Sequence, residues 1–170
     1  MGVAEFRVSS VKPEVLGELA PLRRKGIYLL LLHLEQSRFL RVGCLGRRRF
    51  PAGWYTYVGS AFGPGGLAAR VGRHGVRLKA CHWHIDYLRR HVSLHEIWIS
   101  HSWRVLEHHW AEVLCSDPLA VMVMPGFGSS DCSCPSHLFH FRQAPLPDQY
   151  AALQMDHRLV VTHAPKNHGH

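Results

Sequence analysis

The residues from position 53 to position 74 combine side chains that could act on a phosphate group. The run GWYTYVGSA is rich in aromatic and β-branched residues and predicts a strand over residues 53–61. After a glycine-rich loop, Arg70, Arg73 and His74 recur at helical spacing. The sequence therefore places Tyr57 toward the end of a strand, and a basic helix that could pack against the strand end follows. Glycines in the loop would let the backbone approach a bound phosphate closely.

A second group of reactive side chains is Cys132-x-Cys134-x-x-His137. Thiolates and an imidazole at this spacing can share one Zn²⁺ with a fourth ligand from elsewhere. The candidates for that ligand are Cys81, His82, His84 and His108. The alternative is a packed loop with two reduced thiols, in which Asp131 caps the following turn. The five cysteines are an odd number, so we do not expect a disulfide scaffold.

The positive charge is concentrated in one part of the chain. The formal net charge is +8 at pH 7, and between Gln36 and His95 the only acidic residue is Asp86. The basic residues of that stretch are Arg38, Arg41, Arg47, Arg48, Arg49, Arg70, Arg73, Arg77, Lys79, Arg89 and Arg90. An arginine-biased genome would explain the excess of arginine over lysine but not the missing acids. The block therefore favours a nucleic-acid partner, with Arg73, Arg77 and Lys79 among the contacts.

The elements that must position these groups follow from hydrophobic periodicity. We expect strands over residues 25–34, 38–46, 53–61, 93–100, 119–124 and 137–142, and helices over 67–78, 84–91 and 103–114. In the last helix Val105, Leu106, His109 and Val113 are predicted to face inward. Three early strands followed by helices indicate an α+β fold with a small, mostly antiparallel central sheet flanked by helices.

The length and the N-terminal residues set further expectations. A chain of 170 residues suits one compact domain. The longest apolar run, Ile27 to Leu32, is far shorter than the ~20 residues that a membrane-spanning helix needs. No basic region followed by an apolar stretch opens the chain, so we expect no signal peptide and a cytoplasmic protein without a membrane partner. The oligomeric state stays open.

Three motifs in a fixed order resemble the GIY-YIG nucleases. They are KGIYLL at residues 25–30, YVGSA at 57–61 and LAARVGRH at 67–74. The chain is also similar to a group of small archaeal and bacterial proteins of undefined function, distantly related to those nucleases. The residues that carry this second resemblance are WHIDYL at 83–88 and GFGSSDCSCPSHL at 126–138. One departure is the long separation between Gly26 and Tyr57, which implies an inserted strand over residues 39–45.

The resemblance implies a set of catalytic residues. Tyr28 and Tyr57 take the places of the two motif tyrosines, and Arg70 that of the helical arginine. His82 or His84 takes the place of the following histidine, and Glu107 that of the metal-binding glutamate, with Glu112 as the fallback. His74 joins the set because it lies one helical turn after Arg70 on the same side.

These assignments imply a divalent-metal-dependent endonuclease that hydrolyses DNA phosphodiester bonds in repair or processing. Glu107 would hold Mg²⁺ or Mn²⁺, which acts as a Lewis acid. A tyrosine, with an ordinary pKa near ~10, could serve as base only if Arg70 and a metal-bound water lower that pKa. The loop with Cys132, Cys134 and His137 is expected to fold back on the helix of Glu107, with His108 as the fourth ligand of a structural Zn²⁺.

Two alternatives and a division of the chain complete the expectations. The protein could be a noncatalytic nucleic-acid-binding module on the same fold, with or without zinc, or a scaffold that uses the fold for protein contacts. We divide the chain into an N-terminal extension over residues 1–24 and a GIY-YIG-like domain over 25–142. A C-terminal tail follows over 143–170, and we expect it to be largely disordered after residue 162.

Overall fold

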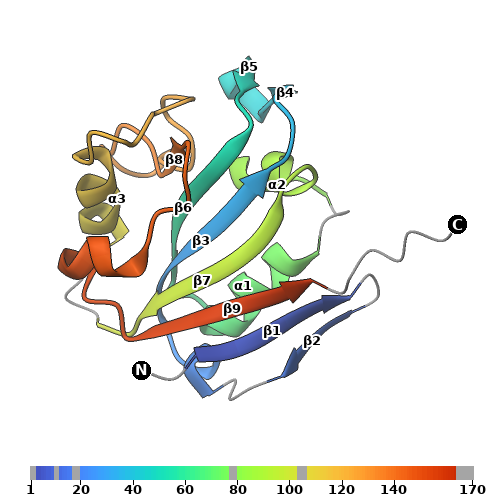
Figure 1. Cartoon of the computed structure of the whole chain (residues 1–170), viewed down its shortest axis with the longest axis vertical. Helices are drawn as coiled ribbons and strands as arrows, with labels where there is room; N and C mark the ends of the chain where they lie inside the picture. Colours follow the sequence, from blue (N-terminus) through green and yellow to red (C-terminus); the bar gives the residue numbers. More distant parts are fainter. Residues whose placement is uncertain (1–2, 10–11, 17–19, 77–79, 103–106, 164–170) are drawn as a thin grey trace, which may run out of the picture.

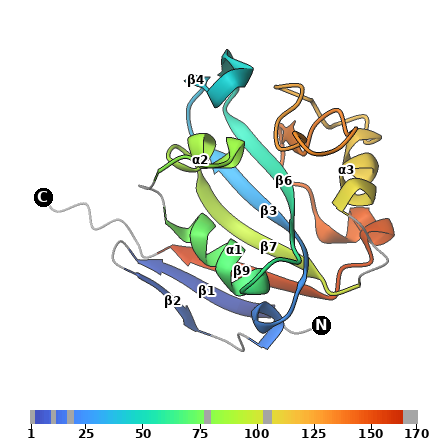
Figure 2. The ribbon, with the colours of Figure 1, turned by 180° about the vertical axis from the view of Figure 1, so that it is seen from behind.

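The chain folds around one twisted β-sheet with helices on both faces, as a computed structural model shows (Figures 1 and 2). The structure describes residues 3–9, 12–16, 20–76, 80–102 and 107–163. The sheet is made of β1 (Val3–Ser9), β2 (Lys12–Leu16), β3 (Gly26–Leu34), β6 (Gly53–Ala61), β7 (Ser93–Ser100), β8 (Leu138–Phe141) and β9 (His157–His163). Its order is β2-β1-β9-β7-β3-β6-β8. All pairs except β1–β9 are antiparallel, which confirms the α+β class.

The helices lie in two layers. They are α1 (Gly66–Gly75), α2 (His84–Arg89) and α3 (Glu107–Cys115), with short 3₁₀ segments η1 (Ala20–Arg23), η2 (Gly43–Leu45) and η3 (Pro147–Leu153). Figures 1 and 2 show α1 and α2 on one face of the sheet and α3 and η3 on the other. No helix in the described ranges is long and apolar enough to cross a lipid bilayer.

The alternation of β3 explains why both faces are covered. Successive side chains of a strand point to opposite faces. Ile27, Leu29 and Leu31 enter the core beneath α3 and η3, while Tyr28 and Leu30 enter the core beneath α1 and α2. A strand that is apolar at nearly every position needs cover on both sides, and KGIYLLLLHL meets that condition. β3 is accordingly a central strand, paired with β6 and β7.

The sheet extends beyond the segment 25–142. β9, within residues 143–170, pairs with β7, and β1, within residues 1–24, pairs in parallel with β9. Both segments that we expected to flank the domain thus contribute strands to the same sheet. The expected disorder after residue 162 falls mainly on residues 164–170, which lie outside the described residues.

The insertion between β3 and β6 is a hairpin rather than one strand over 39–45. β4 (Arg38–Arg41) and β5 (Arg47–Phe50) pair antiparallel and form a separate two-stranded sheet. Residues 47–50, which lie outside the strands and helices expected from the sequence, form β5. The hairpin is anchored because Leu40, Val42 and Phe50 are buried in the core beneath α1 and α2.

Two other sequence predictions were wrong. Residues 119–124 do not form a strand: Val121 makes one isolated bridge with His140, and Leu119 is exposed. On α3, Trp110, Ala111 and Leu114 are buried and Val113 packs against the same core as predicted, whereas His109 is exposed. Val105 and Leu106, also expected to face inward, lie outside the described residues. Apolar periodicity alone did not fix the rotation of this helix.

Candidate active site

Tyr28, Tyr57 and His74 meet beneath α1. Tyr28 of β3 lies opposite Gly59 of β6. Because Gly59 follows Tyr57 by two residues, Tyr57 points to the same face of the sheet as Tyr28. The Tyr28 hydroxyl and His74 Nε2 are joined by a hydrogen bond of 2.7 Å. The His74 ring also lies 6.1 Å from the Tyr57 ring between centroids. A β-carbon at position 59 would come within 2.5 Å of the Tyr28 hydroxyl, so the YVGSA glycine makes room for Tyr28.

Arg70 and Arg73 flank the indole of Trp83. Their guanidinium carbons lie 4.4 and 4.6 Å from the Trp83 ring centroid. Cation–π contacts of this kind hold a guanidinium in place without neutralising its charge. The Trp83 ring is 6.1 Å from that of His74, so Trp83 connects both arginines to the tyrosine–histidine group. Sequence reasoning missed this role, since a tryptophan next to a short helix is most simply a packing residue.

Arg73 has a partner within the protein. Its Nη2 donates to Asp86 Oδ2 at 2.8 Å and to the Ala80 carbonyl oxygen at 3.1 Å. Asp86, the only acid of the basic block, is buried and also accepts from the backbone N–H groups of His82 and Trp83. The ion pair occupies part of the Arg73 guanidinium, and its expected contact with nucleic acid stays a prediction. The other two expected contacts, Arg77 and Lys79, lie outside the described residues.

Burial decides the protonation of the two tyrosines. Tyr28 is 2% exposed and Tyr57 8%. Burial raises the pKa of Tyr28 well above its ordinary value, and the nearby Tyr57 raises it further. Burial, followed by the Glu107 carboxylate, raises the pKa of Tyr57. The Arg70 guanidinium lowers both pKa values, as expected, but by less than burial raises them. In the protein without a metal both side chains are therefore neutral phenols at neutral pH, and the lowering of a tyrosine pKa by Arg70 together with a metal-bound water stays a prediction.

Glu107 influences the tyrosines from a helix in a different layer. Trp110 and Leu114 of the same helix pack in the core on the opposite face of the sheet. Glu107 is the first residue of α3, and its charge acts on the pKa values of both Tyr28 and Tyr57. Its side chain is 26% exposed and lies 3.7 Å from His108 Nε2. The structure therefore brings Glu107 within electrostatic range of the cluster while leaving it accessible to solvent.

The two histidines that competed for one role lie in different places. His82 is exposed, and the contact described for it is made by its backbone N–H. His84 Nδ1 accepts from the Gly128 N–H at 3.0 Å, and burial lowers the pKa of His84. Gly128 in turn lies against Tyr57, because a β-carbon there would come 2.9 Å from the Tyr57 ring. His84 thus supports the loop behind Tyr57, and none of the described contacts joins His82 to the tyrosines.

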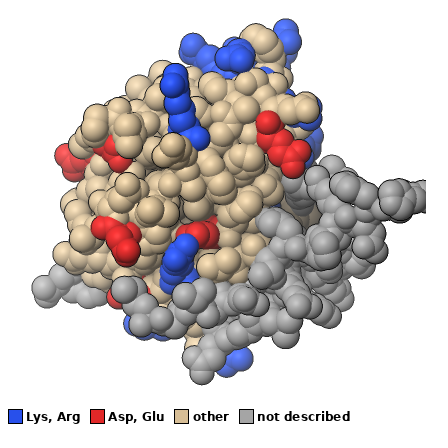
Figure 3. Space-filling model, viewed as in Figure 1, with Lys and Arg blue, Asp and Glu red and all other residues tan. Residues whose placement is uncertain are grey.

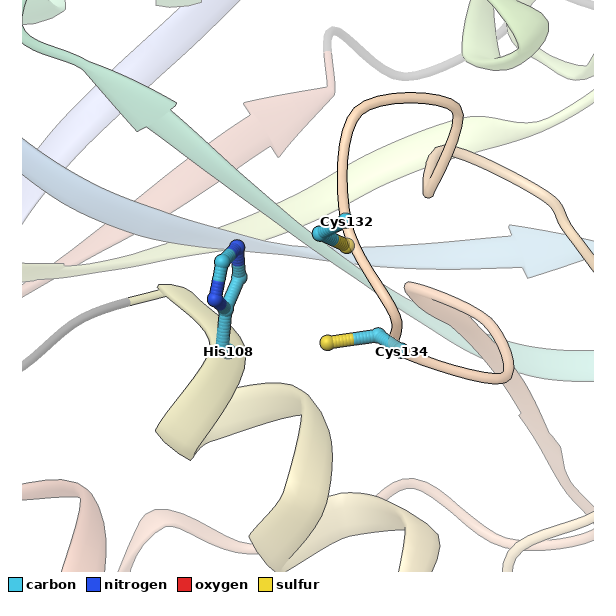
Figure 4. Close-up of side chains that lie close together, drawn as sticks. All are labelled: His108, Cys132 and Cys134. Atoms are coloured by element: carbon cyan, nitrogen blue, oxygen red, sulfur yellow. The ribbon is translucent and has the colours of Figure 1, made fainter.

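The cysteine loop approaches the start of α3. Ligand atoms of His108, Cys132 and Cys134 all lie within 4.8 Å of one another, and Figure 4 shows these side chains converging from the helix and the loop. Cys132 Sγ is also 3.4 Å from His137 Nε2. Burial raises the pKa of Cys134 to about 11, and hydrogen bonding to Cys132 contributes. Burial lowers the pKa of His137. The expected folding of this loop onto the Glu107 helix is thus present in the geometry.

Arginines crowd the β4–β5 hairpin. Residues 38–50 contain five arginines and no acid, and the arginines, Arg38, Arg41, Arg47, Arg48 and Arg49, are all exposed. Phe39 is 61% exposed, and the Arg47 guanidinium carbon lies 5.0 Å from its ring centroid. Basic side chains gather at the top of the molecule in Figure 3, where Figure 1 shows β4 and β5. This surface has the charge that a polyanion requires.

Comparison with known proteins gives one match. A family model described as domain of unknown function DUF123 matches residues 27–158. A search of curated proteins and a search of solved structures each found no significant match. The matched range covers the tyrosines, Arg70, Glu107 and the cysteine loop, and it ends within β9. The resemblance to the GIY-YIG nucleases stays a prediction.

Proposed function

The chain belongs to the DUF123 family of domains of unknown function, and on that premise we propose that it is a divalent-metal-dependent endonuclease acting on DNA phosphodiester bonds. The observation that carries the proposal is convergence. Tyr28, Tyr57, Arg70 with His74, and Glu107 come from four separate elements, and their charges and hydrogen bonds act on one another. Packing alone does not require hydroxyl, imidazole, guanidinium and carboxylate groups at one place. Each of these groups can take part in phosphodiester hydrolysis, as an acid or base, a metal ligand or a group that stabilises negative charge.

The donor set suits a hard divalent cation. Mg²⁺ binds through one or two carboxylates and completes its coordination with waters and substrate phosphate. Glu107 offers one carboxylate that is accessible to solvent. When bound there, Mg²⁺ or Mn²⁺ would supply a Lewis acid for a phosphate oxygen. We do not include His82 in the site, because its side chain makes none of the contacts described for the cluster.

The remaining side chains have separable tasks. Arg70, which stacks on Trp83, would bind the phosphate that becomes more negative in the transition state. Tyr57, a neutral phenol, would donate a hydrogen bond. Tyr28 would move a proton without first becoming the phenolate that the sequence led us to expect. Its hydroxyl can pass its proton to a neutral His74 Nε2 while it accepts one from the attacking water, so His74 ends as the imidazolium and a free phenolate need not form.

The arginine hairpin supports DNA as the substrate. Five exposed arginines without an acid between them would neutralise several phosphates at once. Leu40 and Phe50 fix the hairpin in the same core cluster that contains Tyr28 and Tyr57. A strand of nucleic acid held by the hairpin would therefore bind on the side of the sheet that carries Tyr28 and Tyr57.

The test is cleavage by matched variants. Purified protein is incubated with supercoiled, linear and branched DNA in Mg²⁺ or Mn²⁺, and binding is measured in parallel. We expect cleavage by the wild type and a loss of about 100-fold or more in Glu107→Gln, with binding unchanged, because the carboxylate acts in the transition state. Glu112→Gln, on the exposed side of the same helix, should cleave normally. Equal cleavage by Glu107→Gln and the wild type would overturn the proposal.

A second function is favoured by one observation. Both tyrosines are almost fully buried, which limits their access to a substrate. A noncatalytic module that binds nucleic acid through its arginines would show salt-sensitive binding and no cleavage of any DNA form in either metal. The same assay separates this function from the nuclease.

A further inference from the structure

We propose that His108, Cys132, Cys134 and His137 bind one structural Zn²⁺, which ties the loop over residues 126–137 to the first turn of α3. This inference goes beyond the proposed function and does not depend on it. Ligand atoms of His108 on the helix and of Cys132 and Cys134 on the loop lie within 4.8 Å of one another, and His137 Nε2 lies 3.4 Å from Cys132 Sγ. Two sulfur and two nitrogen ligands are a common set for structural zinc.

The distances suit a tetrahedral ion. With Zn–S near ~2.3 Å and Zn–N near ~2.0–2.1 Å, neighbouring ligand atoms of a tetrahedron lie about 3.4–3.8 Å apart. Cys132 Sγ and His137 Nε2 are 3.4 Å apart. His108, Cys132 and Cys134 have ligand atoms within 4.8 Å of one another, and His137 is joined to this group through Cys132, so binding of one ion by all four requires side-chain rotations. The His108 and His137 ring centroids are 6.1 Å apart.

Few contacts hold the tip of the loop: within it, the Cys132 N–H donates to the Ser129 carbonyl oxygen at 3.4 Å. Its base is held by backbone hydrogen bonds from Gly126 to Pro135 (2.7 Å) and from His137 to Phe127 (2.8 Å). Phe127 is buried, but residues 130, 131, 133 and 135 are exposed, and Cys132 and Cys134 are partly buried between them. Little apolar area is available to order residues 130–135. A metal bound to the two thiolates would supply that order.

Two other uses of the cysteines explain less. All five cysteines are free, so no disulfide orders the loop. A nucleophilic thiol would need one cysteine and one histidine, such as Cys132 with His137. That pairing does not explain why Cys134 and His108 lie next to these two residues. Zinc accounts for all four side chains.

The zinc site would be structural, and its ligands would balance the charge of the ion. Four protein ligands leave no open position for a substrate. Two thiolates balance the charge of Zn²⁺, so the ion would not compete with a hard cation at Glu107, which prefers oxygen ligands. The zinc would instead fix the start of α3, and therefore Glu107, relative to the loop whose Gly128 packs on Tyr57.

The experiment is metal analysis of the full chain, expressed without an affinity tag. We expect stoichiometric zinc in the wild type, retained in Cys115→Ser, whose thiol is exposed at the end of the same helix. We expect the zinc to be lost in Cys132→Ser. His108→Gln is the second variant, because His108 is exposed and its replacement leaves the core intact; circular dichroism confirms that it folds.

Cobalt substitution gives an independent readout. Co²⁺ added to the metal-free chain should give thiolate charge-transfer bands and the visible spectrum of a tetrahedral ion, both weakened in Cys134→Ser. Removal of zinc by a chelator should lower the melting temperature of the wild type and not that of His108→Gln. A wild-type chain that carries no zinc and gives no such spectrum would overturn the proposal, as would full zinc retention in Cys132→Ser.

Discussion

At the level of single residues, the hydrogen bond between Tyr28 and His74 decides which proton the site can move. Both side chains are buried, so neither exchanges protons with bulk water directly. The sequence could supply both residues, because Tyr28 belongs to one motif and His74 lies a turn after Arg70. The sequence could not predict that both side chains are buried, because α1 and the strands bury them together. This burial raises the pKa values of the tyrosines.

The raised pKa values predict a pH dependence of stability. Tyr28 and Tyr57 stay protonated in the folded protein above pH 10, whereas in the unfolded chain they ionise near their ordinary pKa. Above about pH 10 the unfolded state therefore binds fewer protons, and the unfolding free energy should fall by about 1.4 kcal/mol per pH unit for each such tyrosine. This stability is fully present below pH 10.

Denaturant unfolding at several pH values checks this dependence. Between pH 10 and 11, Tyr57→Phe should lose stability less steeply than the wild type, because one of the buried phenols is gone. Phenolate absorbance supplies the control, since Tyr57→Phe should reduce the signal only in the step in which the protein unfolds. A Tyr57 that ionises in the folded protein near pH 10 would show that the site is open to water.

At the level of elements, the β4–β5 hairpin is the unit that we expect to hold DNA. Replacing Arg47 and Arg48 by glutamine should weaken binding about equally for unrelated sequences. It should also reduce the slope of log affinity against log salt by about 0.9 for each phosphate that the variant no longer neutralises. The matched control is Arg23→Gln with Arg24→Gln, two exposed arginines in and beside η1 at the far end of the molecule. Fluorescence anisotropy at several salt concentrations measures both pairs, and equal effects would assign the binding to net charge alone.

Local pattern predicted the elements unevenly. The strands of the apolar runs, β3, β6 and β7, follow from composition and alternation. β5 did not, because RRRF buries only Phe50 and its pairing with β4 is a property of the hairpin. Residues 119–124 carry strand-like residues, yet a turn precedes them in which Asp117 Oδ1 accepts from the Leu119 N–H at 2.7 Å. Turn chemistry outweighed apolar composition there.

At the level of the whole molecule, long-range pairing assembles both the sheet and the site. β9 joins β7 and β1 across almost the full length of the chain, and no local signal in the sequence specifies such a partner. The position of Glu107 likewise depends on long-range packing. The motif order indicated that it belongs with the tyrosines, but its reach from a helix on the opposite face became visible only in three dimensions.

The central claim is that side chains from separate layers act as one catalytic site, and a double-variant cycle tests it most directly. Single-turnover cleavage rates are measured for the wild type, Glu107→Gln, Arg70→Ala and the double variant. Groups that act on one transition state are strongly non-additive, so the double variant should be about as slow as the slower single variant, roughly 100-fold below the wild type. Losses that multiply in the double variant, or single variants that cleave like the wild type, would contradict the account.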